Sequence, residues 1–172
     1  MILSQIAHTS GVIKMSNMAY LHKIGVPSSL LGVGLTELKP FVEQFGRFQK
    51  SYKDYQVFVV LGSPTPYKDA FIVLMLKWFI HNNPDLNASY GFTNMPVSLL
   101  VLPSIETTFN KDFNNQVAVL AQTFYEKKII ICDIPTLEQF KILVGAELFK
   151  YLSYSMGVIN LELKEQTKIK EI

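Results

Sequence analysis

Short apolar runs alternate with longer helical patterns along most of the chain. The run Val57–Leu61 is apolar at every position and ends at Gly62 and Pro64. Continuous hydrophobicity, rather than alternation, is typical of a strand that is buried on both faces. Similar runs predict strands at residues 98–102, 129–131 and 158–163, with a shorter strand at 90–92. Spacing and composition predict helices at residues 38–50, 68–81, 112–126 and 137–151.

Strands that alternate with helices predict an α/β fold, a three-layer sandwich with a mostly parallel central sheet. Ligands of such sheets bind at the carboxyl ends of the strands. In this chain those ends fall at residues 62–69, 103–107 and 132–136. We expect an N-terminal arm over residues 1–34, one core over 35–163, and a charged tail over 164–172.

The composition of the chain excludes several classes of protein to which it could belong. The 172 residues are 49% hydrophobic and 17% charged, which excludes a disordered chain. A single cysteine, Cys132, excludes a disulfide framework and a multi-cysteine zinc site. The net charge of +2 is far from that of a protein that binds nucleic acid mainly by charge. The apolar stretch over residues 70–80 contains Lys77 and is too short to cross a bilayer, so we expect a cytoplasmic protein without membrane contact.

The loop after the first predicted strand matches half of a phosphate-binding pattern. Residues 62–69 follow a buried strand and begin a helix, which is the context of the G-x-x-x-x-G-K-[ST] loop. Gly62 and Lys68 stand at the required separation. Tyr67 occupies the position of the second glycine, and Asp69 that of the hydroxyl that holds magnesium.

Each departure weakens phosphate binding. Pro64 and Pro66 lack the N–H groups with which such a loop holds phosphate. Tyr67 restricts the backbone where glycine allows close approach. Asp69 places a carboxylate near the expected anion, and two like charges about 4 Å apart repel by roughly 4 kcal/mol near a surface. We therefore interpret this loop, with its candidate binding residues Gly62, Lys68 and Asp69, as a degenerate phosphate loop without activity.

Further stretches follow this loop in a fixed order, at residues 99–105, 116–128, 129–133, 136–140, 145–152 and 158–163, and Ile24, Gly25, Val26 and Pro27 precede it. Together, over roughly residues 24–163, they resemble AAA+ ATPases of the bacterial helicase-loader group (the DnaC, DnaI and IstB-like proteins). The resemblance implies a P-loop NTPase-like AAA+ core without a lid domain.

The resemblance does not extend to the family's catalytic residues. The two acids that would follow the second strand fall on Pro103 and Ser104, which carry no charge. The polar residue of the family's sensor strand falls near Cys132 or Asp133. The two arginines of the stretch after it fall on Glu147 and Tyr151. Because phosphoryl transfer depends on cationic and metal stabilisation, this pattern indicates lost catalysis.

For the other candidate residues, a structural role is an alternative to a catalytic or metal-binding one. Asp69, Asp133 and Glu106 could form an acidic cation site at the strand ends, or lie in solvated loops. Cys132 could be a nucleophile, although a small apolar filler is the more common role of a lone cysteine. The three histidines, His8, His22 and His81, lack metal-ligand spacing.

Exposed rings and basic residues are the remaining candidates for binding. Tyr67 lies in a loop, where bases can stack on an exposed ring, and Lys127 and Lys128 form a small basic spot. We take these three as candidates for contact with a partner or with nucleic acid, with solvated surface as the alternative.

We expect a non-catalytic, AAA+-like accessory protein of DNA replication that uses no cofactor. It would bind a protein partner, such as a replicative helicase, a primase or polymerase, or an active AAA+ ATPase, and residues 1–34 would be the docking element. One alternative is a divergent ATPase that binds ATP and Mg²⁺ through Lys68. Another is a module that binds single-stranded DNA.

Overall fold

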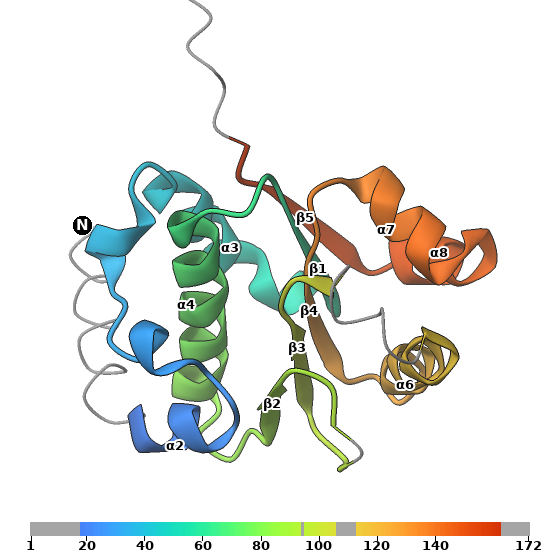
Figure 1. The fold of residues 1–172 in the computed structure, drawn as a ribbon, viewed down its shortest axis with the longest axis horizontal. Helices are drawn as coiled ribbons and strands as arrows, with labels where there is room; N and C mark the ends of the chain where they lie inside the picture. The colour runs from blue at the N-terminus through green and yellow to red at the C-terminus, as the bar shows by residue number, and fades with distance from the viewer. Residues whose placement is uncertain (1–17, 94, 106–112, 163–172) are drawn as a thin grey trace, which may run out of the picture.

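The computed structural model describes residues 18–93, 95–105 and 113–162 (Figure 1). Its strands are β1 (Val57–Leu61), β2 (Ala88–Tyr90), β3 (Leu99–Leu102), β4 (Ile129–Asp133) and β5 (Met156–Asn160). They form one sheet in the order β2-β3-β4-β1-β5, and every pair is parallel. This confirms the predicted α/β class with a parallel central sheet.

Helices cover both faces of the sheet, as expected for a three-layer sandwich (Figure 1). One apolar cluster joins α3 (Val42–Ser51) and α4 (Pro66–Asn82) to side chains such as Phe58 and Val101. A second cluster, on the opposite face, joins α6 (Phe113–Tyr125), α7 (Leu137–Val144) and α8 (Ala146–Ser153) to side chains such as Val59 and Leu100. The described residues also include the short helix α2 (Met18–Lys23).

The order of the strands makes β1 and β4 the point at which the chain changes direction. From β1 the chain crosses through α4, on one face, to β2. From β4 it crosses through α7 and α8, on the other face, to β5. Loops that leave neighbouring strands toward opposite faces open a crevice between them, where ligands of parallel sheets bind. The loop between β1 and α4 lies at this switch point, and Lys68 stands in the first turn of α4.

Helix α4 is buried on nearly all sides. Its residues from Ala70 to Lys77 are all buried, so it packs against the sheet with one side and against the N-terminal segment with another. Lys77 donates from Nζ to the carbonyl oxygens of Leu31 (2.8 Å) and Val33 (2.9 Å). A buried ammonium needs such acceptors, because its desolvation is otherwise unfavourable.

Part of the predicted N-terminal arm is packed on the core. Leu21, Val26 and Val33 are buried in the same cluster as α4. Residues 1–17 of the arm lie outside the described residues, as does all of the predicted tail at 164–172.

Several predicted boundaries were wrong. The helix expected at 137–151 is two helices, because Gly145 adopts a φ of +89° and ends α7. The helix expected from Leu38 begins at Val42. Proline disfavours helical geometry at the residue before it, and Lys39 precedes Pro40. Strand β5 begins and ends earlier than the predicted range of 158–163.

No helix among the described residues is both long enough and apolar enough to cross a membrane.

Candidate functional site

The loop after β1 turns on Gly62. Its φ is +123°, which glycine adopts readily, and a Cβ atom there would lie 3.0 Å from the carbonyl carbon of Leu161. The N–H of Gly62 donates to the carbonyl oxygen of Pro135, at 3.0 Å. The glycine therefore fits between the chain after β5 and the chain after β4, at the switch point of the sheet.

Lys68 points back into the protein. Its side chain is only 1% exposed, and Nζ lies 2.7 Å from Asp133 Oδ1. The same ammonium donates to the carbonyl oxygens of Gly62, at 2.6 Å, and Ile134, at 3.2 Å. An ammonium has three N–H donors, so these contacts use all of them. The lysine that would hold a phosphate is bound instead by Asp133 and by two carbonyl groups of the protein itself.

Asp133 connects the ends of three strands. It is the last residue of β4, and its second oxygen, Oδ2, accepts from the backbone N–H of Ser104, just after β3, at 3.2 Å. Through Oδ1 it holds Lys68, which follows β1. The carboxylate is buried, and its charge is balanced by the ammonium and the N–H. The sequence placed Asp133 at the strand ends but did not pair it with Lys68.

Asp69 follows Lys68 in the chain, and the charges of Asp69 and Asp133 also act on the hydroxyl of Tyr90. Burial raises the pKa of the Asp69 carboxyl, the nearby Asp133 charge raises that pKa further, and Lys68 lowers it in part. Burial also raises the pKa of the Tyr90 hydroxyl, with added contributions from Asp69 and Asp133. The site therefore holds two carboxylates against one ammonium, an arrangement that disfavours any further anion.

The N-terminus of α4 offers few donors to a phosphate. Pro66 is its first residue and has no N–H. The N–H groups of Lys68 and Asp69 donate to the backbone oxygen of Thr65, and that of Lys68 also reaches Thr65 Oγ1 at 3.1 Å. These groups are occupied by the helix cap, and only the N–H of Tyr67 remains in the first turn.

The candidate cation cluster is brought together only in part. Asp69 and Asp133 are neighbours, whereas Glu106 lies outside the described residues. Among residues that the structure describes, no three histidine, cysteine or acidic side chains are grouped so that they could hold a metal. His22 and His81 are exposed, and His8 is again outside the described part of the chain.

Cys132 is an apolar filler at the end of β4. It is fully buried in the cluster beneath α7 and α8. Burial raises the pKa of its thiol, and the Asp133 charge raises it further. A thiol that is buried and protonated is a poor nucleophile.

The three candidates for partner or nucleic-acid contact do not form one surface. Tyr67 lies near the carboxyl end of β1 and packs edge-on against Phe41, with ring centroids 6.2 Å apart. Lys127 and Lys128 lie in the turn before β4, at the opposite end of the parallel strands. The Lys128 carbonyl accepts from Gln56 Nε2 at 2.8 Å, so this turn is fixed by its backbone.

No protein-family model matches the chain, and no curated protein is detectably similar to it. What the site can do therefore rests on its own geometry and charge. Its main feature is a motif lysine whose donors are all used inside the protein.

Three further residues are of structural interest. The Tyr90 hydroxyl, at the end of β2, is close enough to Asp69 and Asp133 for their charges to raise its pKa. The backbone N–H of Ser104, a residue with a φ of +46°, donates to Asp133. Gln44, on α3, has a buried Oε1 with no hydrogen-bond partner. The sequence points to Ser104 only as an uncharged position after the predicted strand at 98–102, and to Tyr90 only as the first residue of the predicted strand at 90–92.

Proposed function

We propose that this chain is a catalytically inactive, AAA+-like relative of helicase loaders. It acts in DNA replication by binding a protein partner: a replicative helicase, a primase or polymerase, or an active AAA+ ATPase. Its phosphate loop, with Gly62, Lys68 and Asp69, serves the fold rather than a nucleotide.

The observation that carries this proposal is the ion pair of Lys68 with Asp133, at 2.7 Å. In a working phosphate loop the lysine reaches the β- and γ-phosphates. To do so here, Lys68 would have to leave Asp133 buried without its partner, which costs about 3–5 kcal/mol in proteins. Binding of ATP would therefore carry the free-energy cost of separating this ion pair, which active ATPases do not have.

The topology supports a common origin with phosphate-binding sheets. The loop follows a buried central strand, begins a helix, and lies at the switch point between β1 and β4. That is the place where parallel sheets bind nucleotides. The chain thus keeps the position of such a site while its charges have changed.

The neighbouring positions support loss of catalysis. Pro103 and Ser104, at the end of β3, bring no carboxylate to the site. Glu147 and Tyr151, at the positions of the family's two arginines, are exposed and line a shallow groove between α6 and α8. An acid and a phenol on that face cannot stabilise the charge of a transferring phosphoryl group.

Titration of the full chain with a fluorescent ATP analogue and Mg²⁺ tests the missing nucleotide site. We expect no saturable binding tighter than about 100 μM, which corresponds to roughly −5.5 kcal/mol. Lys68→Met with Asp133→Asn, which removes both charges of the buried pair, is the matched variant, and it should give the same flat titration. Tighter binding by the unmodified chain that this folded double variant loses would favour the divergent ATPase instead.

Capture of partners by the tagged full chain from an extract of its host tests the role in replication. Identification of a replicative helicase, primase, polymerase or AAA+ ATPase among the specifically bound chains would support the proposal. A labelled single-stranded oligonucleotide, measured at two salt concentrations, serves as the comparison. Tight binding to it that falls steeply with salt would favour the DNA-binding alternative.

A further inference from the structure

The two edges of the sheet differ in how the chain covers them. At the β2 edge, the N–H of Tyr90 donates to the Ile24 carbonyl at 3.1 Å, and that of Ala88 donates to Tyr20 Oη at 3.0 Å. The same Tyr20 hydroxyl donates to the Leu86 carbonyl. The outward N–H groups of this short strand are therefore satisfied by the segment around α2.

Strand β5 forms the other edge, and among the described residues it pairs only with β1. The Ser155 carbonyl accepts from Val57, and the Leu161 N–H donates to Leu61, so both groups face β1. Because backbone groups alternate along a strand, those of Met156, Val158 and Asn160 face the open side. The open side thus presents the hydrogen-bonding groups that a further strand would use.

The usual protection of an edge strand is missing from β5. Its five residues contain no charged residue and no proline, and Val158 is 48% exposed. Edge strands of soluble proteins commonly carry such residues, or a covering element, to prevent pairing with other chains. An edge that no described strand pairs with, and that lacks such residues, is suited to strand addition.

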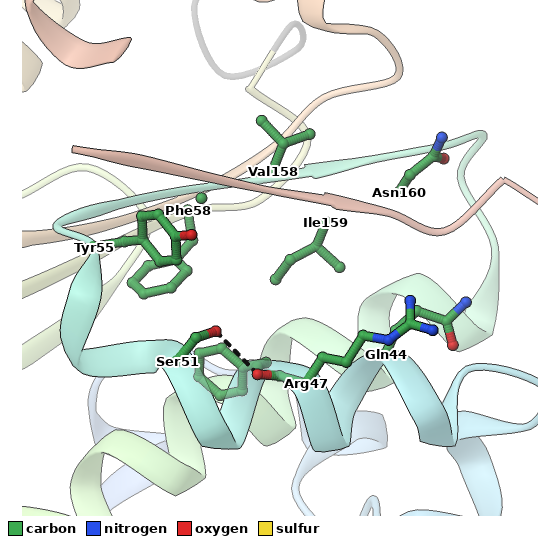
Figure 2. Close-up of a pocket in the computed structure, with 10 residues that line it drawn as sticks. Gln44, Arg47, Ser51, Tyr55, Phe58, Val158, Ile159 and Asn160 are labelled. Carbon is green, nitrogen blue, oxygen red and sulfur yellow. Dashed lines mark hydrogen bonds between the residues drawn. The ribbon is translucent and has the colours of Figure 1, made fainter. Parts of the chain in front are cut away.

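A cavity of about 340 Å³ lies beside this edge, between β5 and α3 (Figure 2). Its apolar wall includes Phe48, Phe58 and the ring of Tyr55. Figure 2 shows Ile159 pointing into this space, whereas Val158 and Asn160 point away from it. The cavity has the size and the aromatic surface to take one large side chain.

The polar groups of the cavity indicate which side chain fits. Gln44 Oε1 is buried and accepts no hydrogen bond, and a buried acceptor without a donor is unfavourable. Because this oxygen has almost no exposed surface, the Gln44 side chain would have to turn before an O–H or N–H group of an occupant could satisfy it. Arg47, also in the lining, uses one NH₂ group on Glu43 at 2.7 Å and has further donors for a carboxylate.

We propose that an extended, acidic segment of the partner protein adds as a strand to the open side of β5. A tyrosine or tryptophan of that segment enters the cavity, where its polar atom donates to Gln44, and a neighbouring carboxylate binds Arg47. Alternate side chains of an added strand lie on the face that α3 covers, which brings one of them to the cavity. This inference rests on the proposed function, because it assumes a protein partner.

Selection of random ten-residue peptides displayed against the full chain tests this site. We expect enrichment of peptides that contain tyrosine or tryptophan beside aspartate or glutamate. Binding of the best synthetic peptide is then measured to Val158→Pro and to its matched control, Val158→Ala. Proline removes only the outward N–H of residue 158 and is tolerated on an edge strand.

The peptide should bind Val158→Pro at least about tenfold more weakly than Val158→Ala. Gln44→Leu should weaken tyrosine-bearing peptides more than their phenylalanine counterparts. Thermal unfolding of each variant verifies that it is folded. The inference is overturned by undiminished binding to Val158→Pro, by enrichment without aromatic residues, or by no enrichment at all.

Two other occupants are separate outcomes that would also overturn it. A concentration-dependent dimer that Val158→Pro dissociates would assign the edge to a second copy of the chain. An oligonucleotide that competes with the peptide would assign the cavity to a base. If either holds while a replication protein is still captured by Val158→Pro, the proposed function stands and only this site is wrong.

Discussion

Helix α4 contains two buried lysines that serve the protein in similar ways at opposite sides of the helix. They are nine residues apart, about 180° around an α-helix. Lys68 faces the strand ends and binds Asp133 with two carbonyl oxygens, whereas Lys77 faces the N-terminal segment and binds the carbonyl oxygens of Leu31 and Val33. One stands in a phosphate-loop pattern and the other does not, yet both charges are satisfied inside the fold.

This comparison shows that a motif position does not decide what a charge does. A lysine serves a ligand only if its ammonium is available when the ligand arrives. Lys68 is as deeply buried as Lys77, with 1% and 0% of each residue exposed. By this criterion both are structural residues, and substitution should affect stability in both cases.

The largest effect is expected from Lys68→Met. It leaves the Asp133 carboxylate buried without its cation, which should lower the free energy of unfolding by about 3–5 kcal/mol. Lys68→Met with Asp133→Asn removes both charges and keeps an acceptor for the Ser104 N–H, so it should recover much of that loss. Urea unfolding of the two variants measures the difference. A Lys68→Met protein as stable as the unmodified chain would contradict the structural role.

A smaller effect is expected from Lys77→Met. The substitution keeps the length of the side chain but leaves the Leu31 and Val33 carbonyls without this donor, at a cost of about 1–3 kcal/mol for a buried group. Lys50→Met, at an exposed position of α3, is the control and should change little. Proteolysis should also show earlier cleavage within residues 18–38 in Lys77→Met. Equal unfolding curves for the two variants would be inconsistent with the contact.

The smallest effect is a pH dependence at Asp69. Its pKa is raised above the ordinary value of 3.8, mainly by burial and by Asp133. The folded state therefore favours the protonated carboxyl, and this contribution to stability is lost as the pH rises above that value. Asp69→Asn should be more stable than the unmodified chain at pH 7, by less than about 1 kcal/mol because the site is partly solvated.

Thermal unfolding at pH 7 and at pH 3 measures this difference, which should vanish at the lower pH. Asp85→Asn, in an exposed loop, is the matched control. A stabilisation that persists at pH 3 would show that the amide acts through hydrogen bonding rather than through charge.

Local patterns were sufficient for much of the fold. The apolar run Val57–Leu61 has the same bounds as β1, and the helix expected at 68–81 lies within α4. The strand predicted at 158–163 starts one residue after Gly157, whereas β5 begins at Met156 and includes this glycine. In the structure it pairs with Phe58, and a Cβ there would come within 2.9 Å of the Tyr55 ring. The need for glycine arises from a contact that no local pattern contains.

The sequence by itself determined the class of fold, the place of the Lys68 loop at a strand end, and the missing charges at Pro103 and Ser104. Only the tertiary structure decided that Lys68 faces Asp133, and that, among the described residues, one edge of the sheet is covered while β5 is open. The physical reason is distance along the chain. Strand and helix propensities act between near neighbours, whereas an ion pair across β1 and β4 exists only once the crossovers have brought those strands together.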